Sequence, residues 1–276
     1  MSRRLANNCV PSIDRALTIM EVLADSKRGL TNSEISRKQK LPKSTTSYIL
    51  RTLEQRGYLY KDHDSGKYRV AAKLFSVGSL ALHGLELNDI ALPVLQKLVD
   101  KTGLTSHLAI LDGHEAVFVQ KVDKPGMIKM NTWIGRRLDV HSTGVGKALI
   151  AYAAPAAMEE IIREKGLPKR TPNTITSSAQ LFSELAKVRS MGYATDNCEN
   201  SPDIKCIAAP IFNSNGKVEA AVSVTGTETQ MKLLKIETYV KLVKQAARNL
   251  SRQLGYDSSP RRSAVSKRVT YSAIEG

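Results

Sequence analysis

A glycine-rich stretch near the middle of the chain contains residues that could hold a phosphate. Residues 141–152 read HSTGVGKALIAY, so that Gly146-Lys147 leads into an apolar, alanine-rich run. A phosphate-binding loop needs a glycine, four residues, and then Gly-Lys followed by a serine or threonine that helps to bind magnesium. Here His141 stands where the first glycine is needed, and Ala148 stands where the hydroxyl is needed. The sequence therefore argues against nucleotide hydrolysis.

The same stretch keeps one property of an anion site. Residues 143–146 predict a loop that leads into a helix from Lys147 to Ala153. The free N–H groups at the start of a helix favour an anion, whether or not it is a phosphate. We therefore expect an anionic ligand here and no cofactor, and the rest of the chain has to indicate which anion.

The cysteines and histidines do not predict a metal site or an enzyme. The three cysteines are an odd number without a C-x-x-C pair, which suits a reducing compartment: Cys9, Cys198 and Cys206. The spacing of the histidines gives no H-E-x-x-H motif: His107, His114 and His141. Cys206, a histidine and Asp196 could be drawn as a nucleophilic triad. No G-x-S-x-G elbow exists and no motif places a base near Cys206, so we expect no catalysis.

Positive charge is concentrated in the N-terminal quarter of the chain. The net charge is +15, and residues 1–73 hold 15 Lys and Arg against 7 Asp and Glu, whereas residues 74–255 hold 22 against 17. Such clustering favours a nucleic-acid partner, and a generally basic surface is the alternative. No apolar run approaches the ~20 residues of a membrane helix, and the N-terminus has no apolar signal region. We therefore expect a cytoplasmic protein without a membrane partner.

The elements that must position these residues begin with three short helices and a hairpin. Helices are expected over 12–26, 31–40 and 41–57, and strands over 58–62 and 67–71. Ser12 is a plausible cap of the first helix, Thr31 and Glu34 form a capping box, and Gly57 ends the third helix. This order is the winged helix-turn-helix plan, which we place at 12–72, with a linker helix at 73–85.

The third helix of a helix-turn-helix lies in the DNA major groove, where its early residues meet base edges. The predicted outward and wing residues are Lys43, Ser44, Thr46, Ser47, Tyr48, Arg51 and Lys67. Short hydroxyls suit phosphates and base edges, Arg51 could pair with guanine, and Lys43 is better placed for phosphate. The alternative is a small helical domain with a hydrophilic face.

From residue 86 the pattern changes to strands flanked by helices, which predicts an α+β domain over 86–255. Strands are expected over 105–113, 114–123 and 127–135 and in an apolar hairpin over 206–226, and helices over 87–103, 147–153, 155–165, 178–191 and 233–254. The hairpin turns at Asn215-Gly216. Residues 256–276 are polar, basic and unpatterned, which predicts a disordered tail.

At this point the chain resembles a known family. The segments SIDRALTIMEVLA, LTNSEISRKQKLPKSTTSYILRTLEQRGYL, GRRLDVHSTGVGKALIAY and RSMGYATDNCENSPDIKCIAAPIFNSNGKVEAAVSVTG are similar, in order and spacing, to the IclR family of bacterial transcription regulators. The resemblance covers roughly residues 12–254. It implies a GAF-like second domain that binds a small organic acid, and a homodimer or homotetramer. Tyr48 is a departure, because the family often has Arg there.

The resemblance also implies which residues contact the effector. Gly144 and Val145 match positions whose backbone lies against the carboxylate of the effector. The other matching pocket positions are Asp196, Cys206, Ser223 and Thr225. The hydroxyls of Ser223 and Thr225 lie on one side of a strand, because side chains alternate along it.

Each of these residues also has a simpler interpretation. Ser223 and Thr225 could be ordinary strand residues, and Cys206 a small core residue. Met130 and Trp133 could line the pocket or belong to the core, and His141 suits a structural hydrogen bond. Cys198 and the Pro202-Asp203 pair depart from the family pattern, so that no relative fixes the identity of the effector.

Together these observations predict an α+β protein in which a winged helix-turn-helix is joined by a linker helix to a GAF-like effector-binding domain. The predicted function is a ligand-responsive transcription repressor that binds a pseudo-palindromic double-stranded DNA operator as a homo-oligomer. The alternatives are an activator of the same family, a sensor whose N-terminal unit contacts protein, and a DNA-binding domain fused to a Cys-dependent catalytic domain.

Overall fold

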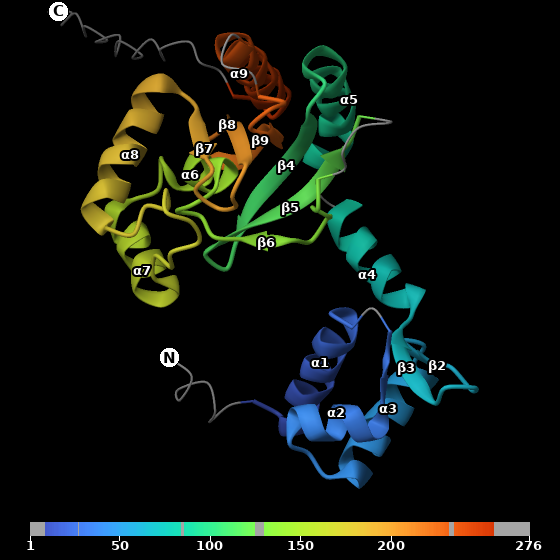
Figure 1. The fold of residues 1–276 in the computed structure, drawn as a ribbon. Helices are drawn as coiled ribbons and strands as arrows, with labels where there is room; N and C mark the ends of the chain where they lie inside the picture. The colour runs from blue at the N-terminus through green and yellow to red at the C-terminus, as the bar shows by residue number, and fades with distance from the viewer. Residues whose placement is uncertain (1–8, 27, 84–85, 125–129, 232–234, 257–276) are drawn as a thin grey trace, which may run out of the picture. The chain divides into compact units, whose positions relative to one another are not determined.

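The computed structural model describes residues 9–26, 28–83, 86–124, 130–231 and 235–256 (Figure 1). The chain forms two compact units, the first made of residues 1–89 and 159–166 and the second of residues 90–158 and 167–276. Within the described ranges, no helix is both long and apolar enough to cross a membrane. The tail that the sequence predicts to be disordered lies, beyond Tyr256, outside the described residues.

The first unit has the winged helix-turn-helix plan. Its helices are α1 (Pro11–Ala24), α2 (Asn32–Gln39), α3 (Lys43–Gln55) and α4 (Ala72–His83). Its small antiparallel sheet has the order β1-β3-β2, with β1 (Leu30–Thr31), β2 (Leu59–Lys61) and β3 (Lys67–Val70). Gly66 has a positive φ of 64° in the turn between β2 and β3. The predicted order of helices and hairpin is confirmed, and α4 covers most of the segment that was predicted to be a linker helix.

Local signals in the sequence set the helix ends in this unit. The predicted capping box is present at the start of α2, where the backbone N–H of Glu34 donates to the Thr31 hydroxyl and the Glu34 carboxylate accepts from the Thr31 N–H at 2.7 Å. Lys40 ends α2 with a φ of 52°, and Gly57 follows α3 with a φ of 74°. The brief turn 40–42 therefore sets α3 across α2.

The buried core of the first unit joins all three of its first helices to the wing. It contains Ile19, Leu23, Ile35, Leu50, Leu53, Leu59 and Tyr68. The start of α1 differs from the prediction, because the cap is Val10 and Ser12 lies inside the helix. The side chains of Ile13 and Leu17 are 57% and 50% exposed, so this apolar stripe does not contribute to the core.

The second unit is built on a six-stranded antiparallel sheet of order β6-β5-β4-β9-β8-β7. Its strands are β4 (Thr105–Asp112), β5 (Glu115–Val122), β6 (Arg137–Leu138), β7 (Ala194–Asn197), β8 (Ile204–Phe212) and β9 (Val218–Thr227). Its helices are α5 (Glu86–Thr102), α6 (Gly144–Ile150), α8 (Ser178–Met191) and α9 (Ile236–Gln253), and the division between the units passes through α7 (Pro155–Lys165) after Met158. The α+β prediction is confirmed.

The two faces of this sheet have different neighbours. Side chains alternate along β8, so Cys206 and Ala209 lie on opposite faces. The Cys206 face is covered by α6, which packs on β7, β8 and β9, and the Ala209 face is covered by α9. In Figure 1, α6 lies against β7 on the side of the sheet toward α8, and α9 lies beyond β8 and β9.

Three parts of the predicted layout of this unit were wrong. The described part of the expected strand 127–135, residues 130–135, has no strand, and the edge strand β6 follows it at 137–138. Strand β7, at 194–197, was not predicted, because four residues are too few for a clear alternating pattern. Helix α6 begins at Gly144, three residues before the predicted start.

Candidate functional site

The start of α6 is fixed by a threonine cap and a glycine without space for a side chain. The Thr143 hydroxyl accepts from the N–H of Gly146 at 3.1 Å and donates to the Asp139 carbonyl at 2.8 Å. A Cβ on Gly146 would lie 2.4 Å from the Cα of Val140, which no structure accommodates without backbone movement. Gly146 is therefore needed for close packing of the helix start on the preceding loop.

Lys147, which resembled a phosphate-binding lysine in the sequence, is instead a structural cation. Its side chain is completely buried, and its Nζ lies 2.8 Å from both carboxylate oxygens of Glu199 and 3.2 Å from Glu184. A lysine that is enclosed by two carboxylates cannot reach a phosphate in solution. The geometry therefore agrees with the argument against nucleotide hydrolysis.

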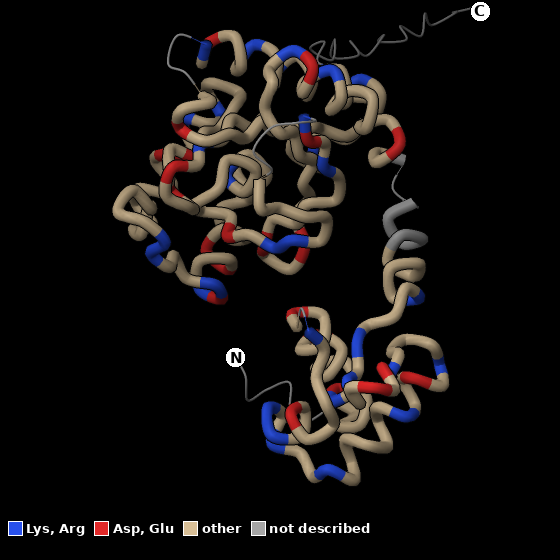
Figure 2. The backbone as a smooth tube through the Cα atoms, turned by 45° about the vertical axis from the view of Figure 1, so that its right-hand side comes forward, with Lys and Arg blue, Asp and Glu red and all other residues tan. Residues whose placement is uncertain are grey.

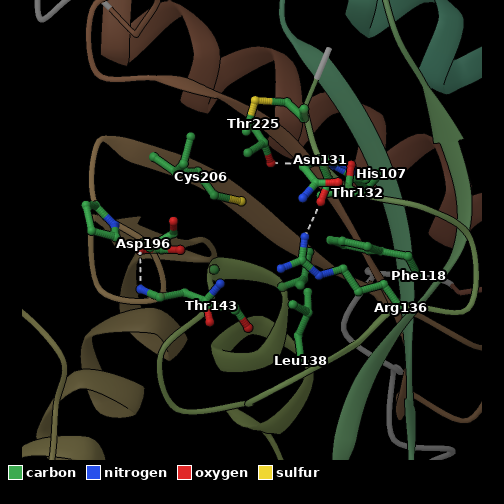
Figure 3. A pocket seen from close by; sticks show the side chains of 17 residues that line it. His107, Phe118, Asn131, Thr132, Arg136, Leu138, Thr143, Asp196, Cys206 and Thr225 are labelled. Carbon is green, nitrogen blue, oxygen red and sulfur yellow. Dashed lines mark hydrogen bonds between the residues drawn. The ribbon is translucent and has the colours of Figure 1, made fainter. Parts of the chain in front are cut away.

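A cavity of about 310 Å³ lies beside the start of α6, on the Cys206 face of the sheet (Figure 3). Strands β4, β5, β8 and β9 supply His107, Phe118, Cys206 and Thr225 to its wall. Five of the six predicted effector residues line it: Gly144, Val145, Asp196, Cys206 and Thr225. Cys206 faces Thr225 directly across the β8–β9 pair. The fold thus brings together residues that are more than 80 positions apart in the sequence.

Ser223 is the sixth predicted effector residue, and the structure does not place it in the wall. Its side chain is fully buried, and its hydroxyl has no hydrogen-bond partner among the described residues. Ser223 is the cross-strand partner of His107, whose ring, and not the serine hydroxyl, lines the cavity. The alternation in AVSVTG correctly put Ser223 and Thr225 on one face, but it could not show how deep each hydroxyl lies.

Arg136 is the most informative residue that the sequence analysis missed. Its guanidinium reaches into the cavity in Figure 3, donates to the carbonyl of Asn131, and lies 5.0 Å from the centre of the Trp133 ring. No carboxylate among the described residues forms an ion pair with Arg136. Its neighbour Arg137 points the other way and pairs with Asp112 and Glu115 at 2.8 and 2.9 Å. An unpaired guanidinium in a cavity can bind a carboxylate through two parallel hydrogen bonds.

The segment before Arg136 contributes to the wall because it is irregular. Met130, Asn131 and Thr132 line the cavity, whereas Trp133 is 55% exposed and is not a core residue. The sequence analysis considered Met130 for the pocket, whereas the predicted strand over 127–135 hid the contributions of Asn131 and Thr132. The signal that could have identified Arg136 is the alternation in RRL, because Arg136 and Leu138 both line the cavity and Arg137 does not.

His107 is held in the cavity wall as a neutral hydrogen-bonding group. Burial, together with the nearby positive charge of Lys121, lowers the pKa of His107 to about 3. Its Nε2 lies 2.8 Å from the Thr132 hydroxyl, and its ring stacks on Phe118 with centroids 4.2 Å apart. At neutral pH the ring therefore carries no charge that would compete with Arg136 for an anion.

Asp196 holds the loop that closes one side of the cavity. Its Oδ1 accepts from the backbone N–H groups of Glu199 and Asn200 at 2.7 and 3.4 Å. Burial raises the pKa of Asp196 to about 7, so that a large share of the carboxyl groups are neutral near physiological pH. The loop that it holds adds three wall residues that were not predicted, Asn200, Ser201 and Pro202, and β8 adds Ile204 directly after it.

The cavity is poorly suited to the nucleophilic chemistry that was considered for Cys206. Burial raises the pKa of the Cys206 thiol to about 12, and the thiolate is the reactive form of cysteine. His141 lies elsewhere, with its Nε2 3.1 Å from the Pro168 carbonyl, as expected for a structural histidine. The described residues contain no group of three or more His, Cys, Asp or Glu that could hold a metal ion.

The predicted DNA-facing residues lie mainly on the open face of α3. Lys43, Ser44, Tyr48 and Arg51 are exposed, and Ser47 is half-buried. The Arg51 guanidinium lies 5.7 Å from the centre of the Tyr48 ring, which is itself 68% exposed. Lys67, at the start of β3, is half-buried on the wing.

Thr46 was wrongly assigned to the open face of α3. It is completely buried, and its hydroxyl donates to the Pro42 carbonyl at 3.1 Å. The physical reason is helical spacing, since Thr46 lies four residues before Leu50 and seven before Leu53, both of which are in the core. Helical spacing predicts this burial from the sequence once the core face of α3 is known.

Comparison with known proteins covers both units. Residues 12–63 match the family described as the IclR helix-turn-helix domain. Residues 79–252 match the family described as the C-terminal domain of the bacterial transcriptional regulator IclR. The transcriptional regulator XynR of Escherichia coli K12 is 34% identical over 90% of this chain and 98% of its own. The repressor AllR of the same strain is 30% identical over 93% and 94%.

A solved structure with a bound ligand is also similar. The IclR homologue of Microbacterium hydrocarbonoxydans in complex with 4-hydroxybenzoate is 28% identical, has a TM-score of 0.76, and covers 88% of this chain and 98% of its own. The helix-turn-helix unit, the cavity-bearing α+β unit and these matches over nearly the whole chain agree. The chain belongs to the IclR family of bacterial transcriptional regulators.

Proposed function

We propose that this regulator is a repressor that binds a pseudo-palindromic operator and is released from it by a small organic acid in the cavity beside α6. The observation that carries the proposal is the Arg136 guanidinium, which has no carboxylate partner among the described residues and lies in a cavity of about 310 Å³. Arg136 is the only positively charged residue in the described part of the cavity wall, because His107 is neutral. An anionic ligand is therefore the occupant that the electrostatics favour.

The size of the cavity restricts the ligand further. Small-molecule sites enclose roughly 300–1,000 Å³, so this cavity suits a small ligand such as a short or single-ring acid. Hydroxyl and amide groups from Thr132, Asn131 and Thr225 would bond its other oxygens. The aromatic ring of Phe118 offers a stacking surface. The bound 4-hydroxybenzoate of the Microbacterium homologue is a ligand of this chemical class.

The DNA contact that we propose uses α3 and the wing. Arg51 and Tyr48 would read base edges, and Lys43, Ser44 and Lys67 would hold phosphates. Repression is favoured by the similarity to the repressor AllR, and activation is the alternative. A homodimer would match a two-fold operator. The apolar side chains that α1 and α4 leave exposed, Ile13, Leu17, Phe75 and Val77, support such a partner surface, and a homotetramer is the larger form that we consider.

Release by the ligand requires a differential affinity. An acid changes DNA binding only if it binds one arrangement of the protein better than the other. The loop that Asp196 holds is one candidate for this difference, because its residues line the cavity and its backbone depends on that carboxylate.

The proposal is tested by fluorescence anisotropy of the full chain on duplex DNA from its own upstream intergenic region, with a scrambled duplex as the control. We expect tighter binding to the upstream duplex, with the steep salt dependence that several phosphate contacts produce. Organic acids are then screened for release. Equal binding to both duplexes, or no binding by folded protein, would contradict the proposed function.

Two neighbouring arginines provide a matched pair of variants for the ligand site. Arg136→Gln should raise the acid concentration needed for release by about ten- to a hundredfold, because a hydrogen bond to a charged group contributes roughly 1.5–3 kcal/mol. Arg137→Gln makes the same charge change outside the cavity and should leave that concentration within about twofold. If both variants raised the required acid concentration equally, Arg136 would not be a ligand contact.

A further inference from the structure

A second strongly charged surface lies on the second unit, away from the effector cavity. Helices α5 and α9 flank a groove of about 580 Å³. Its cationic residues are all exposed: Lys97 and Lys101 on α5, and Lys241, Arg248 and Arg252 on α9. We call it the α5–α9 groove. Lysines and arginines along the chain can be followed as blue segments in Figure 2.

The cations of this groove lie together without an acidic partner in the described part of the chain. Elsewhere lysines and arginines form ion pairs, such as Lys121 with Asp123 at 3.0 Å and Arg170 with Asp139 at 2.7 Å. Among the described residues, the five groove cations form no ion pair, and no Asp or Glu lines the groove. An ordinary solvated helix face usually carries both signs of charge, so this separation creates a positive potential along the groove.

The accessible lining of the groove is mainly polar, and Leu242 is the one half-buried apolar residue among those described there. Val94, Leu98 and Ala246 form its floor, but their side chains are at least 92% buried. Between the cations, Gln245 and Asn249 offer exposed amides. An amphipathic helix would find little apolar surface to cover here, whereas a phosphate backbone would find cations and hydrogen-bond donors.

The cations of α9 also have a suitable spacing for such a backbone. From Lys241 to Arg252 the helix rises by roughly 16 Å, at about 1.5 Å per residue. One DNA strand carries a phosphate about every 3.4 Å along the helix axis, so this row spans roughly five phosphates. Three cations distributed over that length can each neutralise a separate phosphate.

We propose that the α5–α9 groove binds the sugar-phosphate backbone of DNA that flanks the sequence read by α3. The inference rests on the proposed function, because the first unit would hold DNA near the protein. Tethering of this kind raises the effective concentration of flanking DNA at any second basic surface. The groove would add affinity and salt dependence without sequence preference, because phosphate contacts carry no base information.

The test compares two triple variants with equal loss of charge. The groove variant carries Lys241→Gln, Arg248→Gln and Arg252→Gln. The control variant carries Lys124→Gln, Lys169→Gln and Lys217→Gln, which change exposed lysines outside α5 and α9. Full-length proteins are titrated by anisotropy with the upstream duplex in two forms, one trimmed to the protected footprint of α3 and the wing and one with its natural flanks. Thermal unfolding checks that each variant is folded.

We expect an effect only for the groove variant on flanked DNA. Loss of three phosphate contacts should reduce the salt slope by about 2.7, at about 0.9 per contact. Between 50 and 200 mM salt, the wild type should then lose about 40-fold more affinity for flanked DNA than the groove variant does. On trimmed DNA the groove variant and the wild type should have the same slope.

Several results would overturn the inference and leave the proposed function intact. One is an unchanged salt slope of the groove variant on flanked DNA. Another is an equal fall of the salt slope in the control variant, and a third is an equal fall in the groove variant on flanked and on trimmed DNA. Unchanged DNA binding, combined with binding of poly-glutamate by the wild type but not by the groove variant, would assign the groove to an acidic protein. If the wild type bound neither duplex, the proposed function itself would be contradicted.

Discussion

The buried lysine after the glycine pair provides a quantitative test of what the Gly-x-Gly-Lys segment does. Replacing Lys147 by Met keeps a long apolar stem but removes the charge that faces Glu199 at 2.8 Å and Glu184 at 3.2 Å. Glu199 is 7% exposed, so its carboxylate would remain buried without its main cation. Breaking a buried pair in this way costs about 3–5 kcal/mol. For a domain of this size that corresponds to a fall in Tm of roughly 6–20 °C.

The fluorescence of Trp133 allows the unfolding of the second unit to be followed by itself. Trp133 is the only tryptophan in the chain, so its fluorescence during urea unfolding reports on that unit. Lys217→Met, at an exposed position, is the matched control and should change the free energy of unfolding by no more than about 0.5 kcal/mol. Combining Lys147→Met with Glu199→Gln should cost about 1–3 kcal/mol less than the sum of the single changes, because the second change removes the stranded charge.

One outcome would refute this reasoning. If Lys147→Met unfolded within about 1 kcal/mol of the wild type but lost the response to organic acid, the lysine would be a ligand contact. The buried ion pair would then not describe the protein in solution.

Three further predictions use the same two readouts, unfolding and binding. Gly146→Ala should lower the stability of the second unit by about 1–3 kcal/mol or more, because its Cβ would overlap the backbone. Gly144→Ala, whose Cβ would lie 3.1 Å from the Cys206 thiol, should fold and instead weaken ligand binding; equal unfolding curves for the two variants would contradict this contrast. Because the pKa of Asp196 is raised from 3.8 to about 7, its protonated form is favoured in the folded state. This contribution to stability is complete below pH 3.8 and is lost as the pH rises to about 7, so Asp196→Asn should be more stable than the wild type at pH 8, by an upper limit of about 4 kcal/mol, and should have a flatter pH profile. A stability difference that does not vary between pH 4 and 8 would exclude this titration. Arg51→Gln should weaken operator binding by about 1–3 kcal/mol and leave acid binding unchanged, whereas Thr46→Val, inside the core, should change DNA affinity only through stability. If both variants lost a similar amount of DNA affinity at equal stability, Thr46 would be a DNA contact.

Much of the fold follows from the sequence because its signals are local. The capping box at Thr31 and Glu34, the turn glycines Gly57 and Gly66, and the alternating strands on both sides of Gly113 each involve residues within a few positions of one another. Backbone conformation and amphipathic spacing are decided over such distances. The order of the longer helices and strands could therefore be predicted, together with the family that shares it, whereas the short strands β1, β6 and β7 were missed.

The interior of the effector cavity required the tertiary structure. Sequence spacing cannot show that Arg136 points inward without a carboxylate partner while Arg137 pairs with Glu115, since this depends on which strand lies beside β5. It also cannot show that Lys147 is enclosed by carboxylates 37 and 52 positions away. Burial then sets the chemistry, because desolvation raises the pKa of Asp196, and long-range packing determines burial. The sequence determined the longer helices and strands and the shared face of Ser223 and Thr225, and the tertiary structure decided which charges stay free for a ligand.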